Sequence, residues 1–92
     1  MPQQSQVVKM TPVTVSLVER PGREPKFRWI ELSDGRRFQV RSTGASVPCP
    51  GHKAGSLARI WSVEIDWKGR PVHRFIVKDD DDYFIVRAGE DS

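Results

Sequence analysis

Alternating apolar and polar side chains predict a β-strand as the first element of this chain. The alternation has a period of two in a segment rich in β-branched residues, with Val13, Val15 and Leu17 on one side and Thr14 and Ser16 on the other. Residues 19–25 follow and contain Pro21-Gly22, which joins a fixed φ to a residue free to adopt positive φ. This combination predicts a turn or loop after the strand.

Residues 26–42 hold two further alternating runs, joined by Asp34-Gly35. This pair favours a two-residue type I′ hairpin turn, which sets Trp29 opposite Val40. The predicted apolar face holds Phe27, Trp29, Phe38 and Val40, and the predicted cationic face holds Arg28, Arg37, Gln39 and Arg41 around Ile30 and Leu32. A chain of 92 residues has a thin core. We therefore expect the aromatic residues inside rather than as a platform for stacking bases.

A second hairpin is predicted within residues 56–78. Gly69 suits the left-handed position of a three-residue turn at residues 67–69, which sets Asp66 opposite Arg70. The core face of this hairpin then gathers Trp61, Val63, Ile65, His73, Phe75 and Val77. The alternative is a two-residue turn at residues 68 and 69. We prefer the longer turn because the shorter one places Arg74 and Lys78 among the core positions.

The four aspartates at residues 79–82 predict a tight turn before a last strand over residues 83–88. Phe84 and Val86 continue the core in this prediction, and Tyr83, Ile85 and Arg87 lie opposite. Four consecutive acids in one turn cannot all point at one ion. We therefore expect a solvated turn at a strand end rather than a metal site.

About six short strands with little helix predict an all-β protein, a small antiparallel barrel or sandwich comparable in architecture alone with OB and SH3-like barrels. One domain is expected over residues 7–88, between polar ends at residues 1–6 and 89–92. The second face of the C-terminal strands is also apolar. We expect the N-terminal strand, another protein or a second copy of the chain to cover its residues Ile60, Val72, Ile76, Tyr83 and Ile85.

Positive charge is concentrated in the body of the chain. Residues 1–78 carry 14 Lys/Arg and 6 Asp/Glu, a net +8, whereas residues 79–92 carry 1 and 6, a net −5, which together give +3. A basic body attracts polyanions such as nucleic acid. The sequence contains neither a run of about 18 apolar residues nor an apolar signal region, so we expect no membrane contact and a cytoplasmic location.

The cationic face is the first candidate for a binding site. Guanidinium groups bind phosphate oxygens in a bidentate manner, and Ile30 and Leu32 among the arginines favour a contact surface over ordinary solvated strand residues. Trp67 at the predicted hairpin tip adds an aromatic ring, unless its indole folds back onto the sheet. The predicted nucleic-acid-binding residues are Arg28, Arg36, Arg37, Arg41, Trp67, Lys68 and Arg70.

The predicted loop at residues 47–56 contains Cys49 and His52. Their spacing is half of a zinc-ligand pattern, but structural zinc needs four ligands and only His73 remains as a nitrogen ligand, on a predicted core face. No third group is identifiable that would orient a Cys–His nucleophilic pair. We therefore expect no metal site, cofactor or catalytic site, and a surface loop in which Lys53 is a weak candidate for a partner contact.

These patterns predict a small non-catalytic binding module that contacts nucleic acid, single-stranded or without sequence preference, through its arginine-rich sheet face. The alternative is a protein-interaction module, an adaptor or inhibitor, including a homodimer. Such a module would use the basic face, the acidic turn and the apolar C-terminal sheet face.

Overall fold

A computed structural model describes residues 10–51, 55 and 57–87 of the protein. Its strands are β1 (Met10–Val18), β2 (Lys26–Leu32), β3 (Arg37–Pro50), β4 (Leu57–Trp67), β5 (Arg70–Asp79) and β6 (Asp82–Arg87). Each strand pairs antiparallel with the next, and β6 pairs with β1 to close a barrel. The prediction of an all-β protein, a small antiparallel barrel or sandwich of about six strands, is confirmed, and the structure is the closed barrel. The predicted polar ends, residues 1–6 and 89–92, lie outside the described residues.

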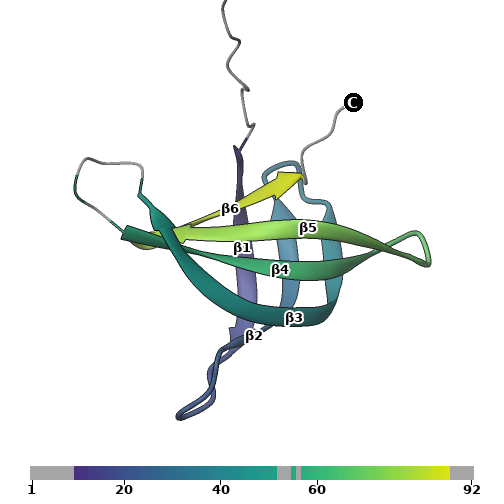
Figure 1. Ribbon diagram of the computed structural model, residues 1–92. Coiled ribbons are helices and arrows are strands. Elements are labelled where there is room, and N and C mark those ends of the chain that lie inside the picture. Colours follow the sequence, from purple (N-terminus) through teal and green to yellow (C-terminus); the bar gives the residue numbers. More distant parts are fainter. Residues whose placement is uncertain (1–9, 52–54, 56, 88–92) are drawn as a thin grey trace, which may run out of the picture.

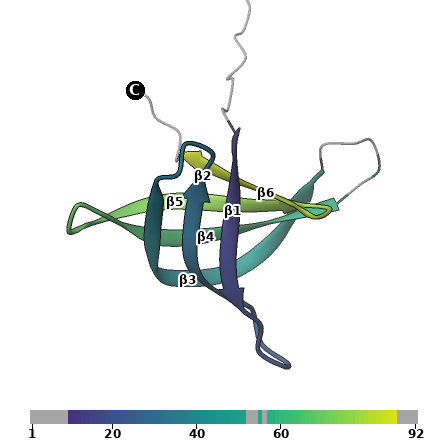
Figure 2. The same ribbon diagram turned by 180° about the vertical axis from the view of Figure 1, so that it is seen from behind.

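The strand order is that of an up-and-down meander, whereas the OB-fold is a Greek-key barrel. Figures 1 and 2 show β1 and β2 running across the direction of β4, β5 and β6. The long strand β3 curves from the first direction into the second, and its ladder with β4 shifts register twice along this curve. Bulges of this kind bend and twist a strand, which lets one continuous segment turn a corner of the barrel. Among the described residues no helix is present that could span a membrane.

The main core lies inside the barrel and takes its buried side chains from β2, β3, β4 and β5, with partly buried side chains of β1 and β6 packed against it. Its buried members are Phe27, Ile30, Val40, Trp61, Val63, Ile65 and Ile76. The ring of Phe27 meets Trp61 edge to face at a centroid distance of 5.0 Å and Tyr83 at 6.0 Å. A second cluster forms on the other face of β3–β6, where Cys49, Ile60, Phe75 and Phe84 pack against Ala58, Val77 and Val86.

The predicted register of the β2–β3 hairpin was wrong by one residue. Trp29 pairs with Gln39, and Ile30 pairs with Phe38. The loop has three residues rather than two: Leu32 and Arg36 close it by a backbone hydrogen bond of 2.8 Å, and Gly35 adopts a φ of 91°. This is the three-residue hairpin loop in which glycine takes the left-handed bulge position, and Asp-Gly is compatible with both loop lengths.

This shift exchanges two side chains between the faces of β2. Ile30, expected among the arginines, is 0% exposed, and Trp29, expected in the core, is 37% exposed. A bulge opposite β1 adds a further change, because Ser16 pairs with Trp29 and Leu17 with Phe27. Arg28 is thus the extra residue of a bulge. In a regular strand, residues three positions apart face opposite sides, but this bulge lets Phe27 and Ile30 both point inward.

The preferred register of the β4–β5 hairpin was also wrong. Trp67 pairs with Arg70, so the turn consists of Lys68 and Gly69 alone, at φ values of 54° and 85°. Two positive φ values make a type I′ turn, whose twist matches that of the flanking strands. The expected conflict with buried cations is avoided because both long side chains stay half-exposed. Arg74 donates to the carbonyl of His73, and Lys78 extends over the ring of Tyr83.

The structure also differs from two smaller predictions. Residues 47–50, expected in a loop, extend β3 and pair with residues 57–60 of β4. The predicted turn within the four aspartates is present, with Asp79 opposite Asp82 and Asp80 at a φ of 58°. Asp79, however, is buried, whereas the other three aspartates are exposed.

Candidate nucleic-acid interface

A groove opens on the surface where β2 and β3 separate. The ladder between these strands covers only residues 29–31 and 37–39, after which β3 bends away. The backbone amide of Phe27 donates instead to the Thr43 hydroxyl, at 3.2 Å. The groove has a volume of about 680 Å³. The bulges in both strands therefore create a hollow that a regular ladder would have closed.

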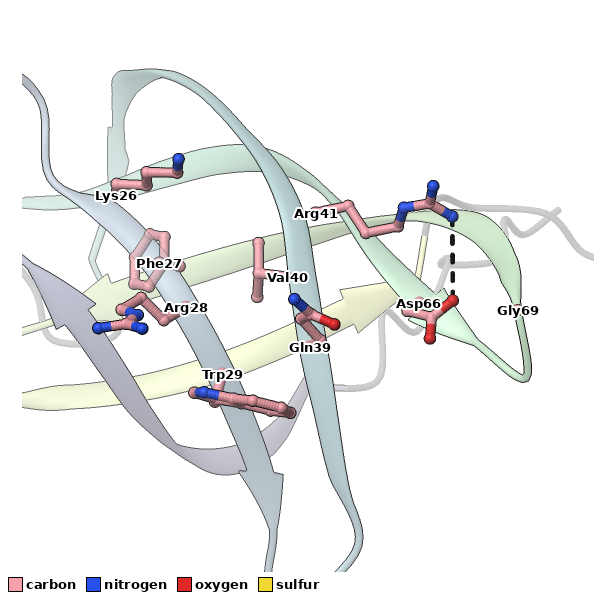
Figure 3. A pocket seen from close by; sticks show the side chains of 9 residues that line it. All are labelled: Lys26, Phe27, Arg28, Trp29, Gln39, Val40, Arg41, Asp66 and Gly69. Carbon is pink, nitrogen blue, oxygen red and sulfur yellow. Dashed lines mark ion pairs between the residues drawn. The ribbon is translucent and has the colours of Figure 1, made fainter.

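Cationic side chains surround this groove, as Figure 3 shows. Its lining consists of Lys26, Phe27, Arg28, Trp29, Gln39, Val40, Arg41, Asp66 and Gly69. Three cations and one carboxylate give it a net charge of +2. Within the described part of the chain, neither Lys26 nor Arg28 has an ion-pair partner. Both charges are thus available to an anion.

Trp29 stands beside this groove on the outer face of the barrel. The guanidinium of Arg37 lies over its indole, 5.6 Å from the ring centroid. A second, smaller hollow on the other side of the indole is lined by Thr14, Val15, Ser16, Trp29, Glu31 and Arg37. The exposed ring therefore separates two surface hollows and lies among cations, an arrangement suited to stacking an aromatic ligand.

Three of the predicted arginines have weak ion-pair partners on the surface. Arg36 is the most engaged, because its Nε contacts Asp34 at 2.8 Å within the hairpin loop. Arg37 lies 3.7 Å from Glu31, and Arg41 lies 3.9 Å from Asp66. Exposed pairs at such distances contribute about 0–1 kcal/mol, so a phosphate can replace these carboxylates.

The predicted second edge of the site lies at the β4–β5 hairpin. Trp67 folds back and stacks on Phe38, with a centroid distance of 5.0 Å and an angle of 18° between the rings. Its indole is half-buried against this ring. Lys68 and Arg70 are exposed at the tip. The hairpin therefore offers two cations but no free aromatic ring.

The predicted protein-interface residues lie mostly in the interior. Val72, Tyr83 and Ile85 pack against the main core, and Ile76 is 0% exposed. Ile60 belongs to the second cluster instead. The cause is the β4–β5 register, since a shift of one residue moves a whole apolar set to the other face. Ile76 cannot contact a partner while the barrel is closed.

A polar network fastens the β1–β2 loop to the sheet. The Ser46 hydroxyl donates to the carboxylate of Glu24, at 3.1 Å to each oxygen, and accepts from Arg59 Nε at 2.8 Å. Trp61 Nε1 also donates to Glu24, at 3.3 Å. Desolvation is the largest effect on the pKa of Glu24 and raises it, but the hydrogen bonds from Ser46 and Trp61 and the charge of Arg59 together lower it below 4.5.

Glu24→Gln is expected to lower the thermal midpoint near neutral pH, and the deficit should shrink in acid. A carboxylate with a lowered pKa stabilises the fold above its unfolded pKa, and this stabilisation is lost as the pH falls through the folded pKa, here below 4.5. Thermal melts of both proteins across this range measure the effect. Glu31→Gln controls for net charge. A deficit that stays constant with pH would contradict the assigned role of the carboxylate.

His73 lies exposed on the outer face, not on the predicted core face. Its Nε2 shares a hydrogen bond with the Ser62 hydroxyl, and its ring contacts Phe75 edge to face at 4.8 Å. Among the described residues, no carboxylate is hydrogen-bonded to this histidine to orient it as in catalytic triads. Cys49 is half-buried in β3, and no group of three metal-ligating side chains occurs in the part of the chain that the structure describes. His52 and Lys53 lie outside that part.

Sequence reasoning missed two groove residues, Lys26 and Trp29, and it placed Gln39 on the cationic face without assigning it a ligand contact. Lys26 stands at the start of a strand next to predicted core, and Trp29 alternates with Phe27 in a way that favours a shared face. The bulge at Arg28 is what places the side chains of Phe27 and Trp29 on opposite faces of β2. A bulge leaves no composition signal in a single sequence, so no pattern in the chain identifies Trp29 as exposed.

No protein-family model, no curated protein and no solved structure matches this chain significantly. The groove residues and their geometry are therefore the observations that bear on function.

Proposed function

We propose that this protein binds single-stranded nucleic acid without sequence preference, through the outer face of β2 and β3. The site comprises Lys26, Arg28, Trp29, Arg37, Gln39 and Arg41. The observation that supports this function best is the exposed Trp29 among these cations. A barrel this small needs its large apolar side chains inside, and an indole left outside beside arginines fits a stacking surface.

The absence of sequence preference follows from the kind of contact. Every base presents a π face to an indole, and guanidinium and ammonium groups contact phosphates, which are the same at each nucleotide. Single strands are favoured over duplexes because stacking on Trp29 requires a base that is free of its neighbours.

Titration of a labelled oligothymidylate tests the proposal. Affinity should fall with salt, with a slope of log K against log salt of about −0.7 per phosphate neutralised. Arg28→Glu with Arg41→Glu should abolish binding, because this variant places two negative charges in the groove. The matched control is Arg20→Glu with Arg23→Glu, which changes net charge equally on the exposed β1–β2 loop. Equal losses in both variants, or no binding by the wild type at about 50 mM salt, would refute the proposal.

Protein interaction is the second candidate function, and one observation favours it. Val47 is 55% exposed and Met10 is 40% exposed beside the second apolar cluster. In the ladders, Val47 pairs with Ile60 and Met10 with Val86, so both lie on the face that carries this cluster. A contact with an apolar centre depends weakly on salt, whereas phosphate binding depends on it steeply. The salt titration therefore separates the two functions.

A further inference from the structure

The groove between β2 and β3 is large enough for more than a bare phosphate. Small-ligand sites have volumes of about 300–1,000 Å³. This groove, at about 680 Å³, lies within that range. Its walls are cationic and its floor includes Phe27 and Val40, while the indole of Trp29 stands at its rim. Such a site fits a ligand with an aromatic group at one end and an anion at the other.

The cations of the groove do not all point into it. Figure 3 shows Arg41 extended away from Lys26 and Arg28 and toward Asp66 on β4. The guanidinium and carboxylate are 3.9 Å apart, with side chains 47% and 37% exposed. At this distance and exposure the pair is weak, and a phosphate that accepts two guanidinium hydrogen bonds is the stronger partner.

We propose that this groove holds the phosphate of one nucleotide whose base stacks on Trp29, and that Asp66 holds Arg41 away until the phosphate displaces it. The inference rests on the proposed function and adds a competition within the site. Lys26 and Arg28 attract the phosphate first, since neither has an ion-pair partner among the described residues. Arg41 then exchanges Asp66 for the phosphate. Asp66 thus limits the affinity of the resting protein.

Asp66→Asn tests this competition by a gain in affinity, which loss of folding cannot imitate. For an oligothymidylate of about eight nucleotides, within the range of about 4–16 that one OB-fold barrel covers, we expect tighter binding. The gain should be about twofold to fivefold at low salt, the equivalent of one exposed ion pair. Glu19→Gln removes the same charge from an exposed residue directly after β1 and is the matched control. A gain in both variants would show an effect of net charge alone and would overturn the inference.

The double variant Asp66→Asn/Arg41→Gln tests whether the gain in affinity depends on Arg41. Arg41→Gln alone should weaken binding and reduce the salt slope by about 0.7, and in its presence Asp66→Asn should gain no more than the control. If the oligonucleotide binds and Trp29→Ala weakens it, but Asp66→Asn has no effect, the competition is refuted while the proposed function stands. If the oligonucleotide does not bind, the proposed function itself fails. If polyglutamate competes as well as the oligonucleotide, the nucleotide assignment is overturned in favour of an acidic protein segment.

Discussion

Ile30→Lys is expected to unfold the protein under conditions in which Trp29→Lys remains folded. Ile30 is 0% exposed between β1 and β3, where Val15 and Phe38 are its cross-strand partners. A lysine there loses the apolar contacts of isoleucine, and its charge, if it stays inside, has no partner; each effect costs several kcal/mol. Domains of ordinary size are stable by only about 5–15 kcal/mol, and a small barrel has little in reserve.

Trp29→Lys introduces the same charged side chain one residue earlier. Because Trp29 lies on the outer face, the new ammonium group stays in water, and the loss should be about 1 kcal/mol. Circular dichroism and urea denaturation of both variants measure the difference. The register expected from the Asp-Gly turn predicts the reverse order, with Trp29 inside and Ile30 outside. A stable Ile30→Lys protein would therefore contradict the β2–β3 ladder.

The existence and type of the elements could be predicted from the sequence, because alternation and turn residues are local signals. The strand at residues 13–17, the hairpins around Gly35 and Gly69 and the last strand after the aspartates are all present. The number and shortness of the strands predicted a small barrel or sandwich, and the β1–β6 ladder in the structure decides for the barrel. None of these inferences depends on which residue faces which across a ladder.

Registers could not be predicted, because each depends on a loop length that the turn sequence leaves open. Asp34-Gly35 accommodates two-residue and three-residue loops, and Lys68-Gly69 required a positive φ at a lysine, which is uncommon. In both hairpins the difference is one residue, and one residue exchanges the faces of a strand. This exchange explains why Ile76 was expected at a surface and His73 in the core.

The candidate site was therefore predicted in part. Its arginines were identified from charge, since Arg28, Arg37 and Arg41 are exposed in either register. The exposed Trp29 and the groove were not identified, because they depend on the bulge at Arg28 and on the bend of β3. The same bulge that admits Phe27 to the core places Trp29 outside. Core packing and the candidate binding surface are thus linked at one residue.

Phe27→Ala is the second substitution with a large expected effect. Phe27 is 0% exposed, and its ring contacts those of Trp61 and Tyr83. Truncation of a buried phenylalanine to alanine costs about 3–5 kcal/mol, through lost transfer energy and the cavity that remains. For a domain of this size such a loss lowers the thermal midpoint by more than about 10 °C. Trp29→Ala, two positions later, should change the midpoint far less.

A double-mutant cycle separates the ring contacts from simple burial. Phe27→Leu and Trp61→Leu keep much of the apolar volume but remove the edge-to-face pair, whose centroids are 5.0 Å apart. Such pairs contribute about 0.5–1.5 kcal/mol beyond their buried area, so the double variant should be less destabilised than the sum of the single variants by that amount. Additive effects would show that the rings do not interact. Since Phe27 reaches Trp61 only if β2 reverses its alternation at Arg28, coupling measured in this cycle also tests the bulge that exposes Trp29.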